Sequence, residues 1–99
     1  MELKESALAR SIEKLMPGQT HDEALGHLLL TEARRKLVKY RTANQHFERK
    51  YHVSFEKFRQ MILDSQPSDE HEQDYFDWEL AVTGIEEMEA EIRYLEGVV

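Results

Sequence analysis

The apolar residues of this chain recur at helical spacing along most of its length. The first fifteen or so residues place an apolar stripe on one face of a helix. Pro17 and Gly18 then stop that helix, because proline lacks a backbone donor and glycine accepts a left-handed turn. The stripe consists of Leu3, Ala7, Leu8, Ile12 and Leu15.

A second, long helix is predicted from Thr20 to Tyr51. Thr20 and Glu23 have the spacing of a capping box, in which the two residues satisfy each other's free backbone N–H groups. No proline follows before Pro67, so nothing in the sequence interrupts the backbone of this helix until its apolar pattern changes. At about 1.5 Å per residue, the helix would be roughly 45 Å long.

The stretch "KYHVSFEKF" predicts a break after the long helix. Its β-branched and aromatic residues weaken a helix, and Ser54 is a suitable N-cap for a new one. Val53 and Phe58 have the spacing of a hydrophobic staple around that cap. A short third helix follows, and the loop "DSQPSDE" separates it from a fourth helix that we expect to end at Gly97.

These elements predict an all-α fold in one domain of 99 residues. We expect three to four helices, including one long basic helix and a heptad-patterned, acidic C-terminal helix, arranged as a helical bundle or a coiled-coil assembly. The predicted ranges are 1–16, 20–51, 54–65 and 68–97.

Two of the helices carry apolar residues at alternating spacings of three and four, the a/d pattern of a coiled-coil seam. In the C-terminal helix the seam comprises Trp78, Ala81, Ile85, Met88, Ile92, Leu95 and Val99. In the long helix it comprises Leu30, Ala33, Leu37, Tyr40, Asn44, Phe47 and Tyr51.

The residues that flank the two seams have opposite charge, which predicts that the two helices pair with each other. Pairing within one chain and pairing between two chains satisfy this pattern equally well. We expect a homo-oligomer in which Asn44, a polar residue in an apolar seam, sets the register. The residues assigned to self-association are Leu37, Tyr40, Asn44, Phe47, Ile85, Met88, Ile92 and Leu95.

Charge is distributed unevenly along the chain. Residues 31–59 hold nine basic and three acidic side chains, whereas residues 60–99 hold one basic and twelve acidic side chains. The net charge of −7 argues against direct binding to nucleic acid or to an anionic membrane. Pairing of the two helices accounts for part of this asymmetry. A surplus of carboxylates remains near residues 69–79, where it would suit a basic partner.

Few residues suggest chemistry of their own. The chain has no cysteine, its four glycines are scattered, and no run of apolar residues is long enough to span a membrane. Glu23 with His27, and His71 with Asp74, share helix faces, but zinc needs three or four converging ligands. We therefore expect a cytoplasmic, non-enzymatic protein without a metal or cofactor.

The segments "FERKYHVSFEKFRQMI" and "DYFDWELAVTGIEEMEAEI" resemble a family of small bacterial and archaeal antitoxin-like proteins from two-gene toxin–antitoxin operons. The resemblance covers roughly residues 44–95, and residues 1–40 show neither a ribbon strand nor a helix-turn-helix for binding an operator. The matching positions are Phe47, Lys50, Tyr51, Ser54, Phe55, Glu56, Phe58, Asp74, Tyr75, Phe76, Trp78, Glu79, Ala81, Val82 and Thr83.

The resemblance implies a protein that binds and silences a small toxin encoded beside it, and such toxins are commonly nucleases. The aromatic, acidic start of the fourth helix would then cover a basic cleft on that partner. The alternative is a structural coiled-coil adaptor that oligomerises and has no toxin. The residues expected to contact the partner are Asp74, Tyr75, Asp77, Trp78 and Glu79.

Overall fold

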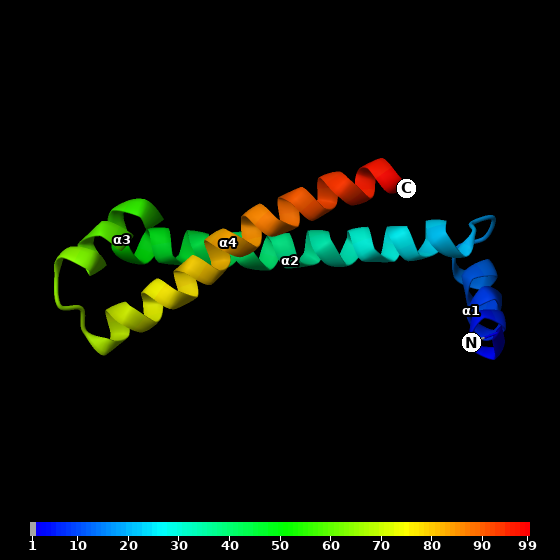
Figure 1. Ribbon diagram of the computed structural model, residues 1–99, viewed down its shortest axis with the longest axis horizontal. Coiled ribbons are helices and arrows are strands. Elements are labelled where there is room, and N and C mark those ends of the chain that lie inside the picture. Colours follow the sequence, from blue (N-terminus) through cyan, green and yellow to red (C-terminus); the bar gives the residue numbers. More distant parts are fainter. Residues whose placement is uncertain (1) are drawn as a thin grey trace.

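The computed structural model describes the backbone of residues 2–99 and the side chains of residues 7–99. It contains four helices in this part of the chain and no strand, so the predicted all-α fold is confirmed (Figure 1). Their bounds differ from the predicted ranges by no more than one residue at either end. The helices are α1 (Glu2–Leu15), α2 (His21–Tyr51), α3 (Phe55–Asp64) and α4 (Asp69–Val98).

Side-chain caps begin three of the helices. The hydroxyl oxygens of Thr20, Ser54 and Ser68 accept hydrogen bonds from the backbone N–H groups of the residues three positions on, at 3.1, 3.2 and 3.1 Å. Each cap satisfies a donor that would otherwise lack a partner at the helix start. The caps predicted at Thr20 and Ser54 are confirmed.

The end of α2 depends on one residue in a left-handed conformation. His52 has a φ of 57°, and its backbone N–H donates to the Glu48 carbonyl at 2.8 Å. This geometry ends the helix and turns the chain back, although it is less common at a non-glycine residue. The break predicted within "KYHVSFEKF" is therefore present. The left-handed conformation of His52 was not among the predictions from the sequence.

The helices α2 and α4 pair within one chain and run antiparallel (Figure 1). Of the two arrangements that the seams allowed, the structure therefore has pairing within the chain. Seam residues from both helices are buried or half-buried between them, and only Val99 at the end of the chain is exposed. The buried members of the two seams are Leu30, Ala33, Leu37, Phe47, Trp78, Ala81 and Leu95.

This pairing places the residues assigned to self-association in a contact within one chain. Leu37, Phe47 and Leu95 are each less than 10% exposed because the other helix of the same chain covers them. Tyr40, Asn44, Ile85, Met88 and Ile92 are half-buried in the same contact. These side chains stabilise the α2–α4 hairpin, and their part in contacts between chains stays a prediction.

Two apolar clusters form the core along the hairpin. A small aliphatic cluster of Leu30, Ala33 and Leu95 lies where the end of α4 meets the start of α2. An aromatic cluster, centred on Phe47, Phe58 and Trp78, lies at the other end, where α3 covers the crossing of α2 and α4. Half-buried residues surround it: Tyr51, Val53, Phe55, Ile62, Tyr75 and Val82.

Opposite charges meet along the flanks of the hairpin, as the sequence predicts. Arg34 lies 3.6 Å from Glu96, and Arg41 lies 3.5 Å from Glu89. All four side chains are at least 41% exposed. Exposed pairs contribute only about 0–1 kcal/mol each, so they orient the two helices more than they stabilise them.

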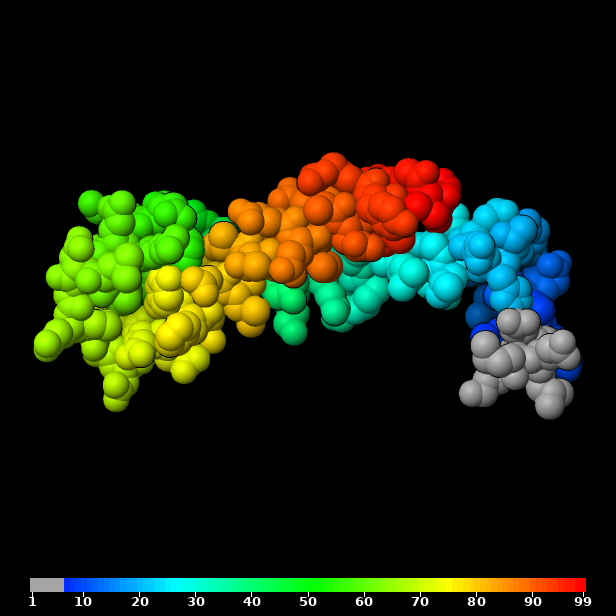
Figure 2. All heavy atoms as spheres, viewed as in Figure 1, coloured from blue at the N-terminus to red at the C-terminus, as the bar shows by residue number. Residues whose placement is uncertain are grey.

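The molecule is an elongated rod of 58 × 24 × 19 Å with α1 at one end. The end of α4 lies beside Gly26, so the first turn of α2 continues past it (Figures 1 and 2). There α1 packs against α2. In its predicted stripe, Ile12 is half-buried whereas Ala7, Leu8 and Leu15 are exposed; the Leu3 side chain lies outside the described residues.

Gly84 allows α2 and α4 to approach each other closely. It is buried, and the ring of Tyr40 lies directly over its backbone. A Cβ atom at this position would be 2.6–2.7 Å from three ring carbons of Tyr40. The two helices can therefore meet at this distance only because residue 84 has no side chain.

We expect Gly84→Ala to destabilise the fold by about 1–2 kcal/mol, since overpacking exceeds the helix propensity that alanine gains. Urea unfolding followed by circular dichroism measures the change. Gly97→Ala is the control, because no atom lies within 4 Å of its added Cβ, and it should be neutral or slightly stabilising. Equal stability of the two variants would show that Gly84 does not control the helix spacing.

Candidate functional site

Trp78, the central residue of the predicted partner contact, lies in the core. Its side chain is 0% exposed, and its ring packs on Phe47 and Phe58 with centroid separations of 5.6 and 5.2 Å. Its indole N–H donates a hydrogen bond to Oδ1 of Asn44 at 2.7 Å. A side chain without exposed surface cannot fill a pocket on another protein, so the structure corrects the assignment of Trp78.

The bond between Asn44 and Trp78 explains the polar residue in the α2 seam. A buried indole N–H needs an acceptor, and the Asn44 amide supplies one from the facing helix. The Asn44 amide nitrogen donates in turn to Glu48 at 3.0 Å. Because this pair joins two specific positions, it fixes the register of α4 on α2 within one chain.

Asp74 belongs to an internal clamp at the start of α4. Its carboxylate accepts a hydrogen bond from the Tyr51 hydroxyl and one from Lys50 Nζ at 2.6 Å. Lys50 also donates to Glu70 at 2.9 Å. The Asp74 side chain is only 15% exposed, so the clamp occupies the carboxylate that was predicted to face a partner.

The clamp shifts the pKa values of its members. Burial would by itself raise the pKa of Asp74, but hydrogen bonds from Lys50 and Tyr51 and the positive charge of Lys50 outweigh it and lower that pKa. Burial and the bond to Asp74 raise the pKa of Tyr51 to about 12. The hydrogen bonds from Lys50 to Asp74 and Glu70 raise the pKa of Lys50.

Tyr75, Asp77 and Glu79 remain at the surface. The Tyr75 ring is half-buried and stacks on Phe55 at 5.8 Å. Its hydroxyl donates to Glu79 at 3.0 Å, and this bond raises the pKa of Tyr75. Asp77 is exposed and accepts a hydrogen bond from Gln73 at 3.1 Å. Three of the five predicted contact residues can therefore reach a partner.

Two apolar residues that the sequence analysis did not select lie on the opposite face from Trp78. Phe76 is 54% exposed and Leu80 is 65% exposed. They precede and follow Trp78 by two positions, which places them on the far side of a helix with 3.6 residues per turn. Their own spacing of four residues was a signal that could have revealed them.

Exposed carboxylates surround these two apolar side chains. We define the outer face of α4 as Phe76 and Leu80 together with the exposed acids Asp69, Glu72, Asp77 and Glu79. No described basic side chain lies within 4.0 Å of any of these four carboxylates. The outer face therefore keeps the surplus negative charge that the internal pairs leave unmatched.

His71 and Tyr40 pack against other parts of the chain. Among residues 7–99, no three His, Asp or Glu side chains converge on a point where a metal ion could bind. His71 packs edge-on against Tyr51 and Phe58. The Tyr40 ring covers Gly84 on the facing helix.

Comparison with protein-family models, with curated proteins and with solved structures finds no match for this chain. Within its described residues, no helix combines the length and the apolar character that a membrane span requires.

We expect Asp74→Asn to destabilise the protein by about 1 kcal/mol at pH 7, the net value of a part-buried hydrogen bond. The lowered pKa of Asp74 means that the carboxylate stabilises the fold above about pH 4 and that this contribution is lost as the pH falls through its folded pKa. The variant should therefore lose less stability on acidification, as measured by urea unfolding from pH 3 to 7.

The matched control is Asp77→Asn, an exposed carboxylate on the same helix, which should change stability by no more than about 0.5 kcal/mol.

The variant Tyr51→Phe tests the contribution of the clamp to stability at alkaline pH. Its raised pKa means that neutral Tyr51 stabilises the fold below pH 10, and that this contribution disappears as the pH rises to about 12. An Asp74→Asn protein with the acid dependence of the parent would contradict the clamp.

Proposed function

We propose that this chain is an antitoxin-like, cytoplasmic protein that binds a small basic toxin encoded nearby and neutralises it without catalysis. The outer face of α4 is the observation that carries the proposal. It combines exposed apolar anchors with unpaired carboxylates, and both features remain after the chain has satisfied its own core and ion pairs.

The composition of the outer face suits a partner with a nucleic-acid-binding cleft. A toxin that acts on nucleic acid as a nuclease presents basic side chains to phosphates, and carboxylates can occupy the same positions. Phe76 and Leu80 would supply the desolvated centre of the contact, while Asp77 and Glu79 on either side would speed association and orient the partner.

The resemblance to antitoxin-like proteins supports this proposal through two groups of residues. Asp74 and Trp78 hold the helices together, so their place in the pattern follows from folding. Phe76 and Glu79 belong to the same pattern but lie at the surface, where folding does not require them. The surface positions of the pattern are the ones that we assign to the partner.

A structural adaptor remains the second candidate function. The heptad seams pair within the chain, where their side chains are buried or half-buried except for Val99. What favours an adaptor is the set of exposed leucines near α1, far from the outer face of α4. An adaptor would not need the acids of the outer face.

We expect the product of the neighbouring gene to arrest growth and co-expression of this chain to relieve the arrest. The variant Asp77→Lys/Glu79→Lys should abolish the rescue, because it reverses the charge beside the apolar anchors. Phe76→Ala should weaken binding of the purified toxin by roughly 30-fold, the effect of losing a hot-spot side chain of about 2 kcal/mol. Growth assays and titration calorimetry measure the two effects.

Leu63→Ala is the control, since Leu63 on α3 is 70% exposed and lies outside the outer face. Trp78→Ala is unsuitable, because removing a buried tryptophan costs about 3–5 kcal/mol of stability and would abolish rescue through unfolding. A harmless neighbouring protein that never co-purifies with this chain would overturn the proposal and favour the adaptor.

A further inference from the structure

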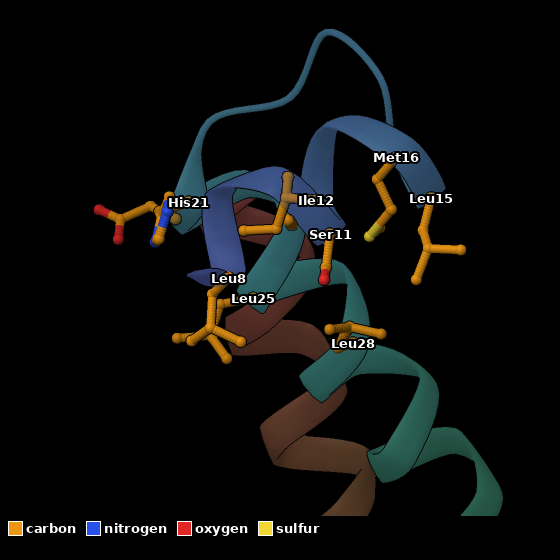
Figure 3. Close-up of a pocket in the computed structure, with 10 residues that line it drawn as sticks. Leu8, Ser11, Ile12, Leu15, Met16, His21, Leu25 and Leu28 are labelled. Carbon is orange, nitrogen blue, oxygen red and sulfur yellow. The ribbon is translucent and has the colours of Figure 1, made fainter. Parts of the chain in front are cut away.

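An apolar groove lies between α1 and the start of α2, at the opposite end of the rod from α3 (Figure 3). It has a volume of about 690 Å³. Four leucines line it, two from each helix, and each is 55–77% exposed. They are Leu8, Leu15, Leu25 and Leu28.

The groove is too open to be a small-molecule site. Ligand pockets enclose about 70–90% of a bound molecule, and their apolar walls are correspondingly shielded from water. Here each of the four leucines has more than half of its surface exposed. Exposed leucines from two helices around one groove instead indicate a surface that another protein segment covers.

The helix α1 needs such a cover. It has 14 residues, and helices of about 12–15 residues are marginal in water unless they pack against something. Its main contact in this chain is with α2. That contact half-buries Ile12 and Met16 but leaves Leu8 and Leu15 exposed by 57% and 77%. The exposed part of its apolar stripe is therefore available to a second surface.

We propose that a second copy of this chain covers the groove, with α1 of each copy packed against α1 and α2 of the other in a two-fold dimer. Charge favours this occupant. Residues 7–30 carry two basic and three acidic side chains, whereas residues 60–99 carry one basic and twelve acidic ones. Two chains with a net charge of −7 each repel less where they meet through this nearly neutral surface than where their acidic residues 60–99 meet.

The shape of the groove also favours a second copy. An amphipathic helix binds an apolar groove through residues spaced three, four or seven apart, and α1 presents the exposed Leu8 and Leu15 with a spacing of seven. Because the same chain contains both the groove and such a helix, a two-fold axis satisfies both surfaces at once. The dimer leaves the outer face of α4 free, and it does not depend on the proposed function.

Sedimentation equilibrium at micromolar concentration tests the dimer. The wild-type chain should have twice the monomer mass of 11.7 kDa. Leu15→Glu should be monomeric, because it places a charge in the interface. Since Leu15 is 77% exposed in the single chain, the variant should keep the α2–α4 hairpin and its helical circular dichroism signal. Leu63→Glu, at the far end of the rod, should remain dimeric.

A second measurement uses the absence of cysteine from the chain. A spin label at Ser11→Cys, which lines the groove, should show a short distance to the label of the other copy. A label at Ser65→Cys, in the loop between α3 and α4, should show a longer one. The proposal is overturned by a monomeric wild type, a dimeric Leu15→Glu, a monomeric Leu63→Glu or an absence of coupling at Ser11.

Discussion

The antiparallel contact of α2 and α4 is the interaction on which the rest of this structure depends. Both apolar clusters of the described residues lie along it or under α3, which covers one end. Close approach at Gly84 and the bond from Trp78 to Asn44 define its distance and register. Without this contact, the two long helices would lose most of their buried apolar surface. Helices with so many charged residues are not stable in isolation.

The same contact determines which residues of α4 are available for function. A helix that gives one face to the core must present the other to solvent, so Trp78 is buried while Phe76 and Leu80, two positions away, are exposed. The acids divide in a similar way. Asp74 and Glu70 bind Lys50, whereas Asp77 and Glu79 have no ion-pair partner among the described residues. Negative charge therefore serves both the fold and the proposed partner contact, through different carboxylates.

The rod has two ends with different surfaces, and this separation allows two interactions at once. The end near α3 carries the acidic outer face, and the end near α1 carries the nearly neutral apolar groove. A charged partner would be selected electrostatically at the first end. Identical chains would meet through the second, where their mutual repulsion is weaker than at the acidic end. Neither surface is required for the α2–α4 core.

The sequence by itself determined the helices, because caps, breaks and apolar spacing are local properties. Thr20, Ser54 and the loop around Pro67 mark helix ends that the structure reproduces within one residue. The two apolar seams and the opposite charges that flank them were also predicted from the sequence. Only the tertiary structure decided that the seams pair within one chain, since identical spacings suit either arrangement. It also decided that Trp78 is core and Phe76 surface, because both are aromatic and only the position of the neighbouring helix distinguishes them.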